Sequence, residues 1–366
     1  MDTPTSNSLF NSSATPIALQ PDISSALVQA PPSPGPSLPS EIVNQVVDAC
    51  DLLSILALRK CSCTLYAHTV EILLLNRRKI LRHYVPNPDL LWEHLEETRA
   101  VIAGLAALSF ILRDLSLLPA TLDLYTSSAH GGRLEQLVEQ EQALPIDDIQ
   151  ILDDPWNELQ PNICRSVTFA THDGRYIAVN SSASLSPLDP IAASPTTAVI
   201  NWVSPYVFAC GYPALTLRRQ SLGLPPFGPE PLLHSIQHRL CELGFDIRSE
   251  PAAWPDYTLC ASPPRNHSQQ PCLHRYYVCP RQGRFFGNKG SLLMVFNLAD
   301  LNLDHLAQQR QPPFGVATAW RLLNAYRDCD GCCVHGDPLL PDVEYTLPLV
   351  IVGPGFSLRG MPPDSH

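Results

Sequence analysis

The stretch Val101–Tyr125, VIAGLAALSFILRDLSLLPATLDLY, decides how the chain folds. Between Arg99 and Arg113 it contains no charged residue. A helix that spans a membrane needs about 20 apolar residues, so this shorter run predicts an element buried inside a domain. After Pro119, a lone acid, Asp123, stands between two leucines, which is typical of a strand with one polar position.

The stretch predicts three elements in order. A strand and a small-residue turn are expected over Thr98–Gly104, a helix over Leu105–Leu112, and a second strand over Thr121–Tyr125. This order resembles the signature of the nucleotidyltransferase fold. In that superfamily a Gly-Ser pair opens a helix over the nucleotide phosphates, and an Asp-x-Asp pair on the next strand holds two metal ions.

The signature is incomplete in this chain. Leu105 stands where the family has its Ser, and Thr121 stands where it has its first Asp, so Gly104 and Asp123 remain. Two magnesium ions at about 3.5–4 Å need bridging carboxylates, and one Asp cannot hold both. The resemblance therefore implies a vestigial nucleotide and metal pocket at Gly104 and Asp123, with no catalytic residue, no metal and no cofactor.

A β-hairpin is expected over residues 164–180, CRSVTFATHDGRYIAVN. Apolar residues alternate on its first strand, and Asp173-Gly174 is typical of a tight turn. The third carboxylate of the family would be expected on the second strand of this hairpin. That strand instead offers Ala178 and Asn180.

Three short helices are expected between Leu38 and Leu75, and they carry more apolar positions than their own core can use. The start Leu38-Pro39-x-Glu41-Ile42 and the leucine-rich segment from Leu52 to Leu58 resemble an F-box, which docks on the Skp-type adaptor of cullin-RING ubiquitin ligases. The resemblance implies adaptor contacts by a set of five residues. These are Leu38, Pro39, Ile42, Leu52 and Leu56. A Trp that the family often carries late in the motif is missing, and a plain three-helix cap on the next domain is the alternative.

The composition places the chain among intracellular proteins with a sizeable core. It has 366 residues, 45% of them hydrophobic, which is enough for a sizeable core. The net charge of -11 does not indicate the basic surface that nucleic-acid binding requires. The N-terminus lacks the pattern of a signal peptide, so the 12 cysteines are expected to stay reduced in the cytoplasm or nucleus, and no segment reaches transmembrane length.

Four regions are expected. They are a disordered tail (1–36), F-box-like helices (37–84), a mixed α/β domain resembling a degenerate nucleotidyltransferase (85–300), and a partly coiled extension (301–366). The fold class is therefore α+β. Further elements are predicted as a helix at Val199–Val207, a helix at Pro231–Gly244, strands at Arg275–Cys279 and Ser291–Phe296, and a hairpin turn at Gly283–Ser291.

Two groups of residues could hold metal. Cys329, Cys332, Cys333 and His335 have zinc-like spacing, but a site would need a second pair such as Cys272 and His274, so a thiol-rich loop is the competing interpretation. His234 and His238 are four apart on one helix but lack a third ligand, which favours surface histidines.

The order of these segments is similar to that of a fungal family without an established activity, in which an F-box-like start precedes a degenerate nucleotidyltransferase-like domain. It implies a non-catalytic interaction protein that links an unidentified target to a Skp-type adaptor. The alternatives are a nucleotidyltransferase that uses Asp123 with Asp147 or Asp148, and a small zinc-stabilised binding module.

Overall fold

The computed structural model describes residues 38–141, 143–145, 162–223, 237–258, 273–280, 282–297, 318–322 and 349–351. The chain divides into two units, Met1–Pro39 and Ser40–His366. The predicted tail, residues 1–36, lies outside the described residues, as does most of the predicted extension. The described part of the second unit is a mixed α+β structure, which confirms the predicted class at that level.

The three predicted N-terminal helices are present as α1 (Ser40–Ala49), α2 (Leu52–Leu58) and α3 (Cys63–Arg82). The Asp51 carboxylate accepts a hydrogen bond from the Ser54 amide at 2.7 Å and so caps α2. The Ser62 hydroxyl caps α3 in the same way through the Leu65 amide at 3.1 Å. Each cap of this kind stabilises its helix by about 1 kcal/mol, which explains why these two helices begin where they do.

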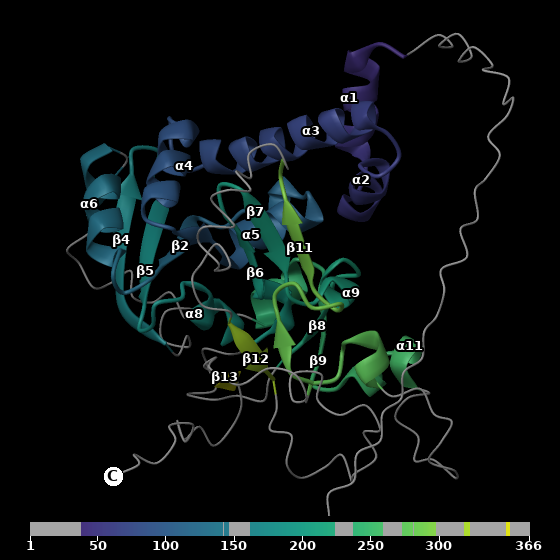
Figure 1. Ribbon diagram of the computed structural model, residues 1–366. Helices are drawn as coiled ribbons and strands as arrows, with labels where there is room; N and C mark the ends of the chain where they lie inside the picture. The colour runs from purple at the N-terminus through teal and green to yellow at the C-terminus, as the bar shows by residue number, and fades with distance from the viewer. Residues whose placement is uncertain are drawn as a thin grey trace, which may run out of the picture. The chain divides into compact units, whose positions relative to one another are not determined.

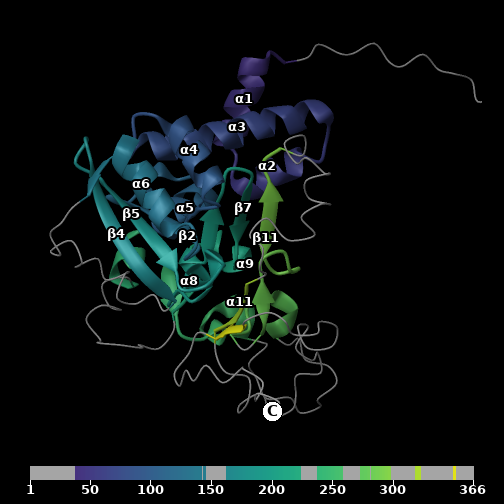
Figure 2. The same ribbon diagram turned by 60° about the vertical axis from the view of Figure 1, so that its left-hand side comes forward.

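Helix α4 (Pro88–Glu97) follows. Figures 1 and 2 show α3 running from α1 and α2 at one end toward α4 at the other, with α1 and α2 on opposite sides of α3. The outward faces of α1 and α2 are therefore separate surfaces.

The main sheet has the strand order β11-β7-β6-β1-β2-β5-β4-β3. Its strands are β1 (Val101–Ile102), β2 (Thr121–Thr126), β3 (Ala143–Pro145), β4 (Ile163–Thr171), β5 (Tyr176–Ser182), β6 (Asn201–Val203), β7 (Val207–Cys210) and β11 (Leu292–Val295). Neighbours β2 and β5 are parallel, and the other pairs are antiparallel. The strand predicted at Ser291–Phe296 is confirmed as β11.

The predicted hairpin is confirmed as β4 and β5. Phe169 lies opposite Ile177, and Gly174 takes φ +71° in the turn, a conformation that glycine adopts without strain. The helix predicted at Val199–Val207 is wrong. This segment forms a short 3-10 helix, η3 (Thr197–Val199), and then the β6–β7 hairpin. The sequence of a strand that is buried on both faces is a continuous apolar run, and periodicity alone does not distinguish such a run from a buried helix.

Several helices lie between the strands along the chain. They are α5 (Gly104–Leu112), η1 (Leu115–Leu117), α6 (Gly131–Glu141), α8 (Leu188–Ala192) and α9 (Pro213–Thr216). One hydrophobic cluster contains Leu52 and Ile55 of α2, Leu73 of α3, Phe110 of α5 and Phe208 of β7. The rings of Phe110 and Phe208 meet edge to face, with centroids 5.1 Å apart. The first three helices and the sheet therefore share one core.

Two smaller sheets lie downstream in the chain. One has the order β10-β12-β13, from β10 (Arg284–Phe285), β12 (Ala319–Arg321) and β13 (Leu349–Ile351); the other pairs β8 (Gln220–Leu222) with β9 (Asp246–Arg248). Short helices η4 (Pro251–Ala253), α11 (Pro255–Thr258) and η5 (Leu273–Tyr276) connect them.

Three downstream predictions have different outcomes. The strand at Arg275–Cys279 is wrong, because this segment begins inside η5 and continues as irregular chain. The turn at Gly283–Ser291 does not close a hairpin, because β10 pairs with β12 while β11 pairs with β7. Of the helix predicted at Pro231–Gly244, residues 237–242 are described and helical, and Gly244 follows at φ +82°.

Candidate functional site

The first candidate site is the outward side of α1. Ile42 and Val46, one turn apart, are 43% and 55% exposed, whereas Val47 on the other face is 1% exposed and lies in the core. We call Ile42 and Val46 the α1 stripe. Leu38, in the unit that precedes α1, is 65% exposed, and Pro39 is exposed as well. Grouped apolar side chains left in solvent are typical of surfaces that bind another macromolecule.

The five predicted adaptor contacts separate into two sets. Leu38, Pro39 and Ile42 are exposed, but Leu52 and Leu56 belong to the core. Positions three or four apart share one face of a helix, and in α2 that face is buried. Leu53, on the opposite face of α2, is 57% exposed. In the second unit, the apolar surface available to a partner is therefore the α1 stripe, with Leu53 on a separate face.

Polar contacts anchor α1 and the α2–α3 turn to the rest of the unit. Arg113, at the C-terminal end of α5, donates from Nη2 to the Asp48 carbonyl oxygen at 2.8 Å and to its carboxylate at 2.9 Å. Burial lowers the pKa of the Arg113 guanidinium, and the Asp48 carboxylate opposes that shift. Arg59, between α2 and α3, donates from Nη2 to the Phe296 carbonyl oxygen at 2.7 Å. The helices are therefore held in a fixed position on the sheet.

The second candidate site is the predicted pocket at Gly104 and Asp123. The Ala103 amide donates to the Asp123 carbonyl oxygen at 3.0 Å, which joins the start of α5 to the middle of β2. Gly104 takes φ +62°, and a Cβ placed there would lie 2.5 Å from Asp123 Oδ2. The structure therefore brings the two predicted residues into contact. A carboxylate beside the first turn of a helix also interacts favourably with the helix dipole.

The strand beside Asp123 brings no second acid to it. On β5, Ala178 is the register partner of Asp123, and Asn180 is the partner of Tyr125. Thr121, the position of the missing first Asp, faces Tyr176. Among the described residues, no group of three His, Cys, Asp or Glu side chains could hold a metal ion. Asp147 and Asp148, the acids of the catalytic alternative, lie outside the described residues.

Besides burial, the charges of Asp123 and Arg175 both act on the pKa of Tyr84. Burial raises the pKa of Tyr84, the negative charge of Asp123 raises it further, and Arg175 opposes the shift. The Tyr84 hydroxyl donates to the Pro119 carbonyl oxygen at 2.9 Å. Burial, and then Arg175, lower the pKa of His83. Sequence reasoning missed Tyr84 and Arg175, because nothing in the spacing of residues links either one to β2.

Most of the predicted metal residues lie outside the part of the chain that the structure describes. Cys329, Cys332, Cys333 and His335 lie outside the described residues, as do Cys272 and His234. His238 is described, and its Nδ1 lies 3.3 Å from the Glu242 carboxylate on the same helix. That contact agrees with the interpretation of His238 as a surface histidine.

No protein-family model, curated protein or solved structure matches the chain. In the part of the chain that the structure describes, every helix is too short or too polar to cross a bilayer.

Proposed function

We propose that this chain is a non-catalytic interaction protein of the F-box-like kind. In this proposal Leu38, Pro39 and the α1 stripe dock on a Skp-type adaptor, and the α/β structure behind them presents a target to a cullin-RING ubiquitin ligase. The observation that carries the proposal is the exposure of Ile42, the last residue of the LPSEI start, and of Val46 one turn later.

The two faces of α1 support a docking role. Val47 occupies the core, so the helix is held without help from Ile42 and Val46. Burying an exposed apolar side chain stabilises a complex by about 1.5–3 kcal/mol when burial is complete, so two or three such residues give a useful share of the binding energy. An amphipathic helix that lays an apolar face into a groove is a common mode of recognition.

The anchoring of α1 gives the proposed scaffold its geometry. The bonds from Arg113 to Asp48 and from Arg59 to Phe296 join the helices to α5 and to the residue that follows β11. A target bound on the α/β structure would then be held in a defined orientation relative to the adaptor.

Co-purification with a Skp-type adaptor tests the proposal. The Ile42→Asp/Val46→Asp double variant of the full chain should lose the adaptor, because two carboxylates would have to be buried in the interface. The matched control is Leu185→Asp, since Leu185 is exposed (68%) and lies in the connection between β5 and α8. Binding by the double variant equal to that of the wild type would contradict the proposal.

A second candidate function, nucleotide binding, is favoured by the contact between Gly104 and Asp123. We infer that any such binding would occur without transfer chemistry, because the described neighbours of Asp123 on β5 provide no second metal-bridging acid. Titration of the full chain with ATP and magnesium, for wild type and Asp123→Asn, tests this function. Saturable ATP binding that changes in the variant would support nucleotide binding as a function, and no ATP binding by either protein would contradict it.

A further inference from the structure

Strand β11 lies at one edge of the main sheet (Figures 1 and 2). It pairs with β7 on one side, and no strand among the described residues pairs with it on the other side. An edge strand offers backbone donors and acceptors to any strand that can lie beside it. The outer edge of β11 is therefore a candidate surface for strand addition.

The register shows which backbone groups of β11 face outward. The Phe296 amide donates to the Tyr206 carbonyl oxygen at 2.9 Å, so Phe296 faces β7. Because backbone groups alternate in direction along an antiparallel strand, Met294 also faces β7, whereas Leu293 and Val295 face outward. Neither outward residue makes a backbone hydrogen bond to another residue that the structure describes. The N–H and C=O groups of both residues are therefore available to a second strand.

The sequence of β11 does not protect this edge. The segment Ser291–Phe296, SLLMVF, contains no charged residue and no proline, which are the residues that commonly discourage pairing at an edge. Leu293 is 42% exposed. The strand at the opposite edge of the sheet, β3, ends with Pro145, which has no N–H to donate. Of these two edges, β11 is thus the one suited to pairing.

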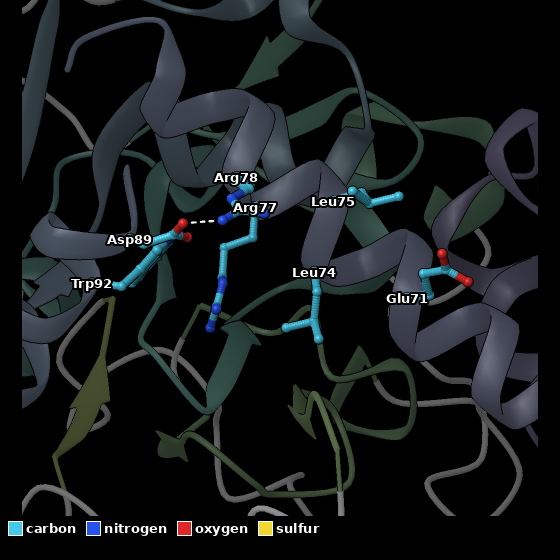
Figure 3. Close-up of a pocket in the computed structure, with 7 residues that line it drawn as sticks. All are labelled: Glu71, Leu74, Leu75, Arg77, Arg78, Asp89 and Trp92. Atoms are coloured by element: carbon cyan, nitrogen blue, oxygen red, sulfur yellow. Dashed lines mark hydrogen bonds and ion pairs between the residues drawn. The ribbon is translucent and has the colours of Figure 1, made fainter. Parts of the chain in front are cut away.

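Two arginines hold the end of β11 in place. Arg59 donates to the Phe296 carbonyl oxygen at 2.7 Å. Figure 3 shows the Arg77 side chain extending from α3 beside Trp92, and its guanidinium lies 5.1 Å from the centre of the Phe296 ring. Arg77 also donates to the Pro205 carbonyl oxygen, in the turn between β6 and β7. A strand that is already fixed loses little further freedom when it pairs with another chain.

We propose that the outer edge of β11 pairs with β11 of a second copy of this chain. An antiparallel pair centred on Met294 places Leu293 of one copy opposite Val295 of the other, and both residues face outward. Every outward N–H then meets a C=O of the other copy. The resulting interface has twofold symmetry, which is the commonest arrangement in homo-oligomers.

The side chains of β11 complement those of a second β11. In the symmetric register Met294 lies beside Met294 of the other copy, and Leu293 lies beside Val295. Apolar pairs across neighbouring strands stabilise a sheet, and like charges directly opposite each other destabilise it. Because β11 has no charged residue, the symmetric pair brings no like charges together within the strands, although the whole chain has a net charge of -11. The pairing uses no residue of the α1 stripe.

Sedimentation equilibrium of the full chain over a range of concentrations tests the proposal, and we expect a reversible dimer. Leu293→Pro removes an outward N–H from each copy but leaves the bonds to β7, and an edge strand tolerates proline in this orientation. Its dimer dissociation constant should be at least about tenfold higher than that of the wild type. Leu293→Val keeps the N–H and an apolar side chain, so it should dimerise as the wild type does. Ile42→Asp/Val46→Asp should also dimerise normally.

Amide hydrogen exchange in the wild type, followed by NMR, locates the pairing without any substitution. The amides of Leu293 and Val295 should become protected as the protein concentration rises, whereas the Met294 amide, which faces β7, should be protected at every concentration. The proposal is overturned if the wild type stays monomeric, if folded Leu293→Pro dimerises as the wild type does, or if the α1 double variant loses the dimer. Exchange at Leu293 and Val295 that does not depend on concentration would also overturn it.

Discussion

Arg113 and Asp48 lie 65 residues apart in the chain, and the Arg113 guanidinium bonds both the carbonyl oxygen and the carboxylate of Asp48. The Arg113 side chain is 7% exposed, whereas that of Asp48 is 44% exposed. Arg113 is thus the buried partner that fixes the C-terminal half of α1. This contact makes α1 part of the main structure rather than a separable helix.

Removing Arg113 should cost more stability than removing the Asp48 charge. Arg113→Met loses both hydrogen bonds, and bonds to charged groups contribute about 1.5–3 kcal/mol. Asp48→Asn retains the carbonyl acceptor, so a loss nearer 1 kcal/mol is expected. Urea unfolding of both variants measures the difference. Equal losses would show that the carbonyl contact contributes nothing.

The two faces of α2 should respond very differently to truncation. Leu52 is 1% exposed, so Leu52→Ala should destabilise the fold by about 2–5 kcal/mol through lost burial and the cavity left behind. Leu53 is 57% exposed, and Leu53→Ala should stay within about 0.5 kcal/mol of the wild type. Thermal or urea unfolding of this adjacent pair checks the orientation of α2, and similar effects would contradict it.

Gly104 should not tolerate a side chain. Gly104→Ala forces a Cβ to within 2.5 Å of Asp123 Oδ2 at φ +62°, and we expect a loss of about 1–3 kcal/mol. Gly132→Ala is the matched control, because no atom lies within 4 Å of a Cβ there, and alanine should stabilise α6 by about 0.4–1 kcal/mol.

A double variant separates the two causes of that loss. Gly104→Ala/Asp123→Ala removes the close contact but keeps the unfavourable φ, so it should be more stable than expected from adding the effects of the two single variants. Strict additivity would mean that the two side chains do not meet.

Tyr84 should make stability fall at alkaline pH. Burial raises the pKa of Tyr84 above its unfolded value, which is about 10. Below that pH both states keep the proton and the stabilisation is complete. Above it the unfolded state releases the proton first, so stability falls as pH rises until the folded-state pKa is passed. Tyr84→Phe should reduce this slope above about pH 10, and an unchanged slope in urea unfolding would contradict the assignment.

Local patterns were sufficient for the elements that local interactions determine. The spacing of apolar residues predicted α2 and α3, which Asp51 and Ser62 cap, and the Asp173-Gly174 turn predicted the β4–β5 hairpin. The pattern also predicted correctly that Asp123 lies beside Gly104, because the turn that contains Gly104 and the strand that contains Asp123 are close in sequence.

What sequence reasoning missed depends on contacts between distant segments. Arg59 bonds Phe296 across 237 positions, and no spacing rule links the two. For the same reason, the apolar pattern did not reveal which helix faces the sheet would cover, so Leu52 and Leu56 were expected at a partner surface. The helix prediction for Val199–Val207 failed for a different reason, since a strand buried on both faces resembles a buried helix in sequence.

The most direct measurement is co-purification of the full chain with a Skp-type adaptor, comparing wild type, Ile42→Asp/Val46→Asp and Leu185→Asp. Circular dichroism should first show that all three proteins are folded. The account predicts adaptor binding by the wild type and by Leu185→Asp, and loss of binding in the double variant. Binding by all three proteins, or by none of them, would contradict the docking role of α1.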